Sequence, residues 1–449
     1  MMDIISELNK NSVFSSLYNK IESKEATVGV IGLGYVGLPL AVEIANSGYK
    51  VVGFDVDINK VDSVNKGESY INDVSEGELS KVVQSQLIEA TNQKSKLEGI
   101  DAVIICVPTP LDTHHQPDIT YVQNATELVR DVMHQGLLVI LESTTYPNTT
   151  LELMLPILEE SSLNVGEDFY LVYSPERVDP GNQNFKTNNI PKVVGGVTKD
   201  CTKLATKLYE NVLNSDIHQV NSPTVAEMSK ILENTFRNIN IGLANEMAII
   251  CEKMGINVWE VIDAASTKPF GFMPFYPGPG LGGHCIPIDP FYLTWKAKEY
   301  KYNVKMVESA SEINNYMPDF VVNKAMKLLN KDSKSLNGAT IYLVGAAYKK
   351  DISDIRESPI FDIIKKLQEN GAIVKFYDPY VNQFELEGEP LISTQLTKES
   401  IIDSDISIII TDHSNVDYEL INTYSKKILD TRNIMTKLGV NINENYFRL

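Results

Sequence analysis

The sequence has few basic residues for its length, and this scarcity limits its possible partners. The chain of 449 residues has 40 Lys and Arg against 59 Asp and Glu, which gives a formal net charge of −19. Non-specific binding to nucleic acid or to an anionic membrane surface requires a basic face, so we expect neither as a partner. An anionic small molecule is still allowed, because a helix N-terminus or a local cluster of cations can bind a phosphate on an acidic protein.

Cysteine pairs and long apolar runs are also missing. The four cysteines, Cys106, Cys201, Cys251 and Cys285, form no CxxC pair, which argues against a zinc site or a disulfide framework, and we predict no metal. No stretch reaches about 18 apolar residues, and the first residues, MMDIISELNKNSVF, lack the basic and apolar regions of a signal peptide. These absences predict a cytoplasmic protein, where a cysteine thiol can stay reduced.

Strand-like and helix-like runs alternate in two parts of the chain. Short apolar runs occur at residues 27–31, 51–54, 102–107, 137–141, 170–173, 339–344, 373–377 and 407–410. Runs that are apolar on both faces are typical of parallel strands covered by helices. We therefore predict an α/β protein with two Rossmann-like doubly wound domains, joined by a long central helix at Pro223–Met254. The predicted parts are an N-terminal arm at 1–25, a first α/β domain at 26–215, a central helical region with a cysteine loop at 216–317 and a second α/β domain at 318–449.

A glycine motif, GLGYVG at residues 32–37, lies between the first predicted strand and a predicted helix, and Asp55 ends the next strand eighteen residues after the motif. In this setting the motif is the fingerprint of a dinucleotide site. Gly32 allows a tight turn, Gly34 lets the backbone approach the pyrophosphate, and Gly37 lets the helix pack closely on the strand. The Asp55 carboxylate can bind both ribose hydroxyls and would repel a 2′-phosphate, so we predict NAD rather than NADP.

Two threonines follow later strands, at the sheet edge where ligands of such folds bind. We predict that Thr109 and Thr144 contact the cofactor or a water, with local capping of the chain as the alternative interpretation. The other residues that we assign to the cofactor site are Tyr35, Val36 and Lys60.

A second motif, GPGLGGHCIPIDP at residues 278–290, places Cys285 after a glycine-rich turn. Backbone N–H groups that converge at such a turn can lower the pKa of a cysteine thiol and can stabilise an oxyanion. The alternative is a small buried side chain in a tight loop. The glycines and the nearby Asp289 favour the reactive cysteine.

Charged and polar side chains elsewhere could join this cysteine. Lys230, Asn234 and Arg237 share one face of the predicted central helix, although a merely solvated face would show the same spacing. Glu176 and Arg177 follow the strand at 170–173 and offer a carboxylate at the mouth of the first domain.

Five motifs occur together in one order: GLGYVGLPLA at 32–41, SPERVDPG at 174–181, EMSKILENTFR at 227–237, GPGLGGHCIPIDP at 278–290 and GAAYKKDISDIRESP at 345–359. Together they resemble the UDP-glucose/GDP-mannose dehydrogenase family over nearly the whole chain after residue 26, and most closely its bacterial UDP-N-acetylhexosamine 6-dehydrogenases. The resemblance implies an NAD-dependent, four-electron oxidation of a UDP-sugar at C6 to a carboxylate. It also implies that residues 26–215 bind NAD, that residues 318–449 bind the UDP-sugar, and that the central helix forms a homodimer or a higher homo-oligomer.

The resemblance assigns roles to several residues. Cys285 matches the family nucleophile, which holds the aldehyde as a thiohemiacetal and then as a thioester. Lys230 matches the lysine that stabilises oxyanionic intermediates, and Asn234 matches the residue that assists it.

Asp289 and Glu176 match carboxylates of the family's acid–base and water-handling apparatus, and Thr144 matches a threonine that helps to hold a water. The substrate contacts implied by the resemblance are Glu176, Arg177, Val178, Lys230, Asn234, Arg237, Gly282 and Lys349.

The segment before the cysteine loop departs from the family pattern. Many members carry an arginine there that is donated across the dimer, but residues 266–275, STKPFGFMPF, contain none, and Lys268 lacks the fork geometry of arginine. The aromatic, proline-rich run resembles the UDP-N-acetylglucosamine branch, which favours UDP-N-acetyl-D-glucosamine as the substrate, in surface polysaccharide synthesis.

Other functions stay open as alternatives. They include the dehydrogenases of UDP-N-acetylmannosamine, UDP-N-acetylgalactosamine and UDP-glucose. A sugar-nucleotide sensor without turnover would need no nucleophile, and a two-electron hydroxyacid dehydrogenase would not need Cys285.

Overall fold

The computed structural model describes residues 2–449 with gaps at 72, 113–115, 180–181 and 183. The chain divides into two compact units, of which the first holds residues 1–233 and 291–301 and the second residues 234–290 and 302–449. The division falls inside helices α8 (Pro223–Met254) and α10 (Asp289–Ala297), so residues of the predicted central region belong to both units.

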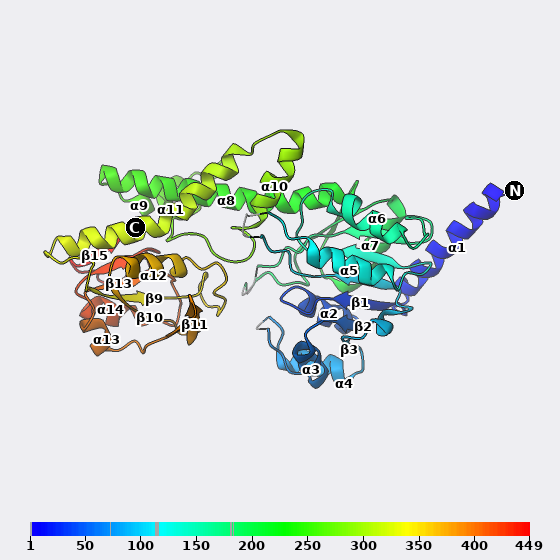
Figure 1. The fold of residues 1–449 in the computed structure, drawn as a ribbon, viewed down its shortest axis with the longest axis horizontal. Helices are drawn as coiled ribbons and strands as arrows, with labels where there is room; N and C mark the ends of the chain where they lie inside the picture. Colours follow the sequence, from blue (N-terminus) through cyan, green and yellow to red (C-terminus); the bar gives the residue numbers. More distant parts are fainter. Residues whose placement is uncertain (1, 72, 113–115, 180–181, 183) are drawn as a thin grey trace. The chain divides into compact units, whose positions relative to one another are not determined.

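An eight-stranded sheet forms the middle of the first unit (Figure 1). In spatial order its strands are β3 (Ile88–Thr91), β2 (Lys50–Phe54), β1 (Thr27–Ile31), β4 (Ala102–Ile105), β5 (Leu138–Leu141), β6 (Tyr170–Tyr173), β7 (Lys192–Gly196) and β8 (Ile217–Val220). The first six run parallel, as the apolar runs predict. β7 instead pairs antiparallel with β6, and β8 pairs parallel with β7. This reversal, which the sequence did not predict, brings the start of β7 to the edge at which the parallel strands end.

Alternate residues of each central strand enter two apolar cores, one on each face of the sheet. On β4, Ala102 and Ile104 join one core, and Val103 and Ile105 join the other. Helices α2 (Gly37–Asn46) and α7 (Lys199–Val212) contribute to the first core, and α5 (Thr120–Arg130) contributes to the second. Both faces are therefore covered, which explains why the strands read as continuous apolar runs.

The predicted N-terminal arm is a helix, α1 (Met2–Glu22). Its last turns bury Leu17 and Ile21 in the first core, and the Ile21 carbonyl accepts a hydrogen bond from the Tyr49 hydroxyl at 2.7 Å. The other helices of this unit include α3 (Ile58–Lys66), α4 (Glu76–Gln84) and α6 (Leu155–Glu159).

The second unit contains a wholly parallel sheet (Figure 1). In spatial order its strands are β10 (Ile373–Tyr377), β9 (Thr340–Val344), β13 (Ile406–Ile409), β14 (Ile428–Asp430) and β15 (Tyr446–Arg448), and β11 (Gln383–Leu386) and β12 (Glu389–Ile392) form a separate antiparallel pair. Ile341 and Leu343 enter one core, whereas Tyr342 and Val344 enter another. Its other helices include α9 (Val258–Ser266), α11 (Lys305–Asn330), α12 (Ile360–Glu369), α13 (Lys398–Ile402), α14 (Tyr418–Tyr424) and α15 (Ile434–Lys437).

The predicted fold class, α/β with two doubly wound sheets, is confirmed. None of the helices in the described part of the chain is long and apolar enough to cross a membrane.

Candidate active site

The glycine motif forms the connection from β1 to α2. Gly32 has a φ of 92°, in the left-handed region that favours glycine. A Cβ on Gly37 would lie 1.8 Å from the Gly32 carbonyl oxygen, so the start of α2 packs on the turn at a distance that only glycine allows. A Cβ on Gly34 would have none of the described atoms within 4 Å. The turn therefore offers an open backbone face at Gly34, which fits the close approach of a pyrophosphate.

Asp55 lies beside this turn and is 6% exposed. Its Oδ2 accepts a hydrogen bond from the Leu33 N–H at 2.9 Å, and its Oδ1 accepts one from the Asp57 N–H at 2.9 Å. The Lys60 Nζ lies 3.4 Å from Oδ2, so Lys60 reaches the cofactor region through an ion pair with Asp55. A carboxylate has about four lone-pair sites, which leaves acceptor capacity for a ribose hydroxyl.

Three threonines follow β4 and β5. The buried Thr109 uses its carbonyl to accept a hydrogen bond from the Tyr292 hydroxyl, and Thr144 is half-buried. Thr145 is 1% exposed, and its hydroxyl has no partner among the described residues. Because an unpaired buried hydroxyl is costly, Thr145 becomes a second candidate to hold a water beside the predicted Thr144. At the start of α2, Tyr35 is exposed and Val36 is half-buried.

The segment after β6 gathers the predicted carboxylate and lysine. The Glu176 Oε1 accepts hydrogen bonds from the N–H groups of Arg177 and Val178, both at 2.6 Å. The buried Lys230 donates from its Nζ to the Glu176 carbonyl oxygen. The Arg177 guanidinium pairs with Glu233, at 2.7 Å between Nη2 and Oε1. Arg177 is thus already held by a carboxylate of α8.

A buried ion pair that the sequence analysis missed lies behind Glu176. The Lys192 Nζ, at the start of β7, is 2.7 Å from the Glu142 Oε2 and 3.7 Å from the Glu176 Oε2, and the Tyr209 hydroxyl donates to the other Glu142 oxygen. Burial by itself lowers the pKa of Lys192, but Glu142 and Glu176 raise it above its ordinary value. Lys192 therefore stays a cation that faces Glu176. It escaped prediction because only the antiparallel direction of β7 brings it there.

Cys285, in the second unit, is exposed, whereas Cys106, Cys201 and Cys251 are buried. The Cys285 carbonyl accepts a hydrogen bond from the Asp289 N–H at 2.8 Å, so a tight turn leads from the cysteine into α10. Asp289 is 3% exposed, and its Oδ2 accepts a hydrogen bond from the Asn234 Nδ2. The structure thus joins Asn234 and Asp289, while Arg237 is exposed on α8.

Two further asparagines of α8 hold the cysteine loop. The Asn238 Nδ2 donates to the Ile286 carbonyl at 3.2 Å, and the Asn245 Oδ1 accepts from the Gly278 N–H at 2.9 Å. Both are buried and stand four and eleven residues after Asn234, so the three asparagines lie on one helical face. That spacing is the sequence signal that could have found them.

The cysteine loop also packs on the turn at residues 345–358. A Cβ on Gly282 would lie 2.5 Å from the Tyr348 Cβ, and the Gly283 N–H donates to the Arg356 carbonyl at 2.9 Å. The same turn carries the half-buried Lys349. Gly282 therefore acts at this site through its lack of a side chain.

Arg432, which follows β14, is a half-buried cation beside the cysteine loop. Its Nε donates to the Ile410 carbonyl at 2.8 Å, and a Cβ on Gly278 would lie 2.7 Å from its Nη1. Its two terminal nitrogens have no hydrogen-bond partner among the described residues. Such a held guanidinium can bind a phosphate or carboxylate. No local pattern indicates Arg432, because its place depends on a contact with Gly278, far earlier in the chain.

Three sequence profiles match successive parts of the chain: the NAD binding domain at residues 26–213, the central domain at 224–316 and the UDP binding domain at 342–437 of one family. The chain belongs to the UDP-glucose/GDP-mannose dehydrogenase family. The predicted resemblance is thereby confirmed. The protein is an NAD-dependent oxidoreductase of this family, and the predicted cofactor, NAD, is confirmed too.

Relatives of this dehydrogenase differ in the sugar that their names give. The UDP-N-acetyl-D-glucosamine 6-dehydrogenase of Pseudomonas aeruginosa is 38% identical over 360 residues, which cover 80% of this chain and 84% of the relative. The UDP-N-acetyl-D-mannosamine dehydrogenase of Methanococcus maripaludis is 37% identical over 418 residues, 90% of this chain and 92% of the relative. The structure of a UDP-D-ManNAc dehydrogenase from Pyrococcus horikoshii has a TM-score of 0.84 at 35% identity and covers 94% of this chain and 98% of that one.

Proposed function

We propose that this dehydrogenase oxidises the C6 alcohol of a UDP-N-acetylhexosamine, with UDP-N-acetyl-D-glucosamine as the first candidate, to the uronic acid. The observation that carries the proposal is the exposed Cys285, in a loop held by the Asn234–Asp289 pair and by close packing at Gly282. Relatives named for the glucosamine and mannosamine substrates have nearly equal identities, which supports the N-acetylhexosamine class. We keep UDP-N-acetylmannosamine, UDP-N-acetylgalactosamine and UDP-glucose as alternatives, and the cytoplasm and surface polysaccharide synthesis as predictions.

When bound, NAD supplies the hydride acceptor for each of the two oxidations. In the proposed sequence the Cys285 thiolate adds to the aldehyde carbon, which forms a C–S bond and an oxyanion. Loss of a hydride from that carbon leaves a thioester. Water then adds, the C–S bond breaks, and the carboxylate and the thiolate are released. The sum converts one alcohol, one water and two NAD into one carboxylate, two NADH and three protons.

The other residues have proposed roles in the same reaction. The Lys230 ammonium, held against the Glu176 carbonyl, would stabilise the oxyanions, and Asn234 would assist it. Asp289 and Glu176 would supply the acid–base groups, and Thr144 or Thr145 would hold the water. The proposed substrate contacts are Glu176, Arg177, Val178, Lys230, Asn234, Arg237, Gly282, Lys349 and Arg432.

We also propose a homodimer or a higher homo-oligomer. Phe236, Leu243 and Ile250 are spaced seven residues apart on α8 and are 46%, 54% and 43% exposed. Large apolar side chains that repeat in this way on one helical face are typical of a helix that packs against another helix.

The substrate class can be tested by steady-state kinetics with four sugars. We expect kcat/KM for UDP-N-acetyl-D-glucosamine to exceed that for UDP-glucose by about tenfold or more, because a pocket shaped for the acetamido group loses its contacts with a hydroxyl. UDP-N-acetylmannosamine and UDP-N-acetylgalactosamine complete the panel. A preference for UDP-glucose would refute the N-acetylhexosamine proposal and leave the dehydrogenase mechanism intact.

Replacing Asp55 should relax the preference for NAD. Asp55→Asn removes the negative charge that repels a 2′-phosphate but keeps an oxygen for the Leu33 N–H. We expect the ratio of kcat/KM for NADP to that for NAD to rise about tenfold, equivalent to ~1.4 kcal/mol. Asp62→Asn, at an exposed position of α3, removes the same charge and should leave the ratio unchanged. Equal use of both cofactors by the unmodified enzyme would show that Asp55 does not discriminate.

A further inference from the structure

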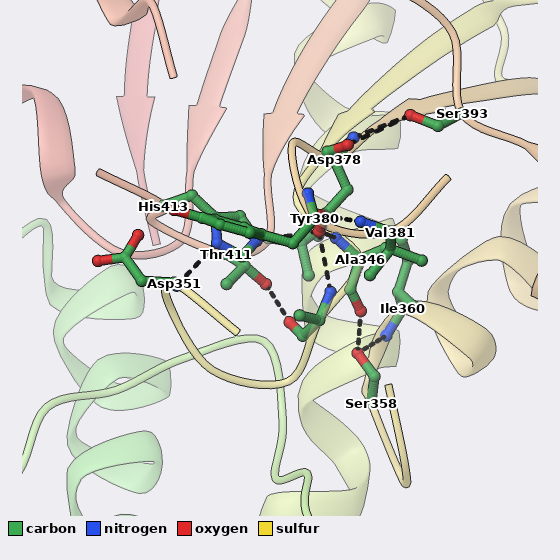
Figure 2. A network of polar contacts seen from close by, with 12 residues as sticks. Ala346, Asp351, Ser358, Ile360, Asp378, Tyr380, Val381, Ser393, Thr411 and His413 are labelled. Atoms are coloured by element: carbon green, nitrogen blue, oxygen red, sulfur yellow. Dashed lines mark hydrogen bonds and ion pairs between the residues drawn. The ribbon is translucent and has the colours of Figure 1, made fainter. Parts of the chain in front are cut away.

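A fully buried histidine joins two segments of the second unit (Figure 2). His413 follows β13, and its Nδ1 accepts a hydrogen bond from the Asp351 N–H at 2.9 Å, while its Nε2 lies 2.9 Å from the Asp378 Oδ2. A backbone N–H can only donate, so Nδ1 carries no hydrogen and the imidazole hydrogen lies on Nε2. His413 therefore connects the turn at 345–358, through Asp351, with the end of β10.

Asp378 is the anchor of this network. It ends β10 as Asp55 ends β2, and its Oδ2 accepts from the N–H groups of Ala346 and Ala347 at 2.6 and 3.1 Å, just after β9. Its Oδ1 accepts two more backbone N–H groups, and it is 3% exposed. Burial by itself raises the pKa of Asp378, but His413 and these N–H groups hold it below its ordinary value. These contacts use every lone-pair site of the Asp378 carboxylate, so its role is to fix the chain. Asp55, which follows β2, keeps acceptor capacity for a ribose hydroxyl.

The turn is tied to the segment after β13 at further points. The Asp351 carboxylate accepts hydrogen bonds from the N–H and the hydroxyl of Ser414, both at 2.7 Å, and the Thr411 hydroxyl donates to the Ala347 carbonyl. Asp351 has a φ of 61°, a left-handed conformation that a non-glycine residue keeps only where its surroundings enforce it. The partners of Asp351 supply that enforcement.

The same turn also packs on the cysteine loop of the candidate active site. Tyr348 packs on Gly282 and Gly283 of the cysteine loop, and Lys349 stands two residues before Asp351. A shift of the turn would therefore move a proposed substrate contact and the support of the Cys285 loop together.

We propose that His413 is a positioning residue: by holding the Asp351 N–H it sets the turn at 345–358, which in turn places Lys349 for the UDP-sugar and supports the loop that bears Cys285. The inference rests on the proposed function for the roles of Lys349 and Cys285. His413 itself is fully buried and acts only through the turn.

Two substitutions separate the halves of the contact. In His413→Asn the amide oxygen can take the place of Nδ1 and still accept the hydrogen bond from the Asp351 N–H. In His413→Gln the amide nitrogen can take the place of Nε2, which preserves the hydrogen bond to Asp378 and loses the one from Asp351. We expect His413→Gln to raise KM for the UDP-sugar about tenfold and to leave KM for NAD unchanged. This effect is smaller than the roughly hundredfold loss of rate that a misplacement of about 1 Å can cause. His413→Gln should also change the rate at which iodoacetamide alkylates Cys285 by about threefold or more, and His413→Asn should stay within about twofold of the wild type in both measurements.

Alkylation can be assigned to Cys285 by mass spectrometry, with Cys285→Ser as the unlabelled control, because the other cysteines are buried. Equal KM values and equal alkylation rates for the two His413 variants would overturn the proposal.

If His413→Gln does not fold, a second variant tests the same turn. Ser414→Ala, at an exposed position, removes one hydrogen bond to Asp351 and should shift both measurements in the same direction as His413→Gln. No shift would overturn the proposal. Alkylation requires no turnover, so an enzyme that forms no NADH from any UDP-sugar would refute the proposed function and still allow the test of His413.

Discussion

Replacing Cys285 with serine is expected to lower the steady-state rate of NADH formation roughly a thousandfold or more, equivalent to about 4 kcal/mol in the activation free energy. A serine hydroxyl is far less ionised than a thiol at neutral pH, so it cannot hold the aldehyde and then leave as a thiolate does. The measurement is absorbance at 340 nm with saturating NAD and UDP-sugar.

A matched control exists for this substitution. Cys251 is buried on α8, packed with Val258, Trp259 and Ile262, outside the proposed chemistry. Cys251→Ala should therefore keep the turnover number within about twofold of the wild type, although a core truncation can lower stability. Unchanged turnover to the acid in Cys285→Ser would rule out the thioester mechanism.

Gly34 and Gly37 of the GLGYVG motif should have different effects on the enzyme when each is changed to alanine. A Cβ on Gly37 would lie 1.8 Å from the Gly32 carbonyl oxygen, and backbone on both sides leaves little room to relax. We expect Gly37→Ala to lower the free energy of unfolding by about 2 kcal/mol or more. A Cβ on Gly34 meets none of the described atoms within 4 Å, so Gly34→Ala should fold normally. It should still raise the dissociation constant for NAD about tenfold or more, because the methyl group stands where the pyrophosphate approaches.

Thermal unfolding followed by circular dichroism and NAD titration by calorimetry separate these two effects. A Gly34→Ala enzyme that binds NAD as tightly as the wild type would show that the pyrophosphate does not lie over this turn. A Gly37→Ala enzyme with an unchanged thermal midpoint would contradict the close packing of α2 on the turn at Gly32.

Local patterns predicted most of the elements that place the site. The strands at 27–31, 170–173 and 373–377 and the helix Pro223–Met254 have the predicted limits, because each combines a strong periodic or apolar pattern with a clear breaker. Among the strands that these patterns missed are β7 and β8. The first reads KVVGG, with glycines that weaken a strand signal, and the second reads IHQV, with polar residues at the edge of the sheet.

Local patterns pointed to candidate site residues where these residues are close in sequence or share a motif. The glycine turn, Asp55 and the cysteine loop became candidates in this way, and the resemblance gave proposed roles to Asn234 and Asp289, which form a hydrogen bond. The ion pair of Lys192 and Glu142 joins residues 50 positions apart, and Arg432 meets the cysteine loop from a distant strand. Such contacts depend on the tertiary fold, so a pattern along the chain cannot reveal them.

The stoichiometry of the reaction tests the central claim most directly. Purified enzyme is incubated with excess NAD and a limiting amount of UDP-N-acetyl-D-glucosamine, and the NADH formed at completion is divided by the sugar consumed. A four-electron oxidation through Cys285 predicts two NADH per sugar and a uronic acid as the product. One NADH per sugar, with the aldehyde as the product, would contradict the account and leave the exposed cysteine without its proposed role.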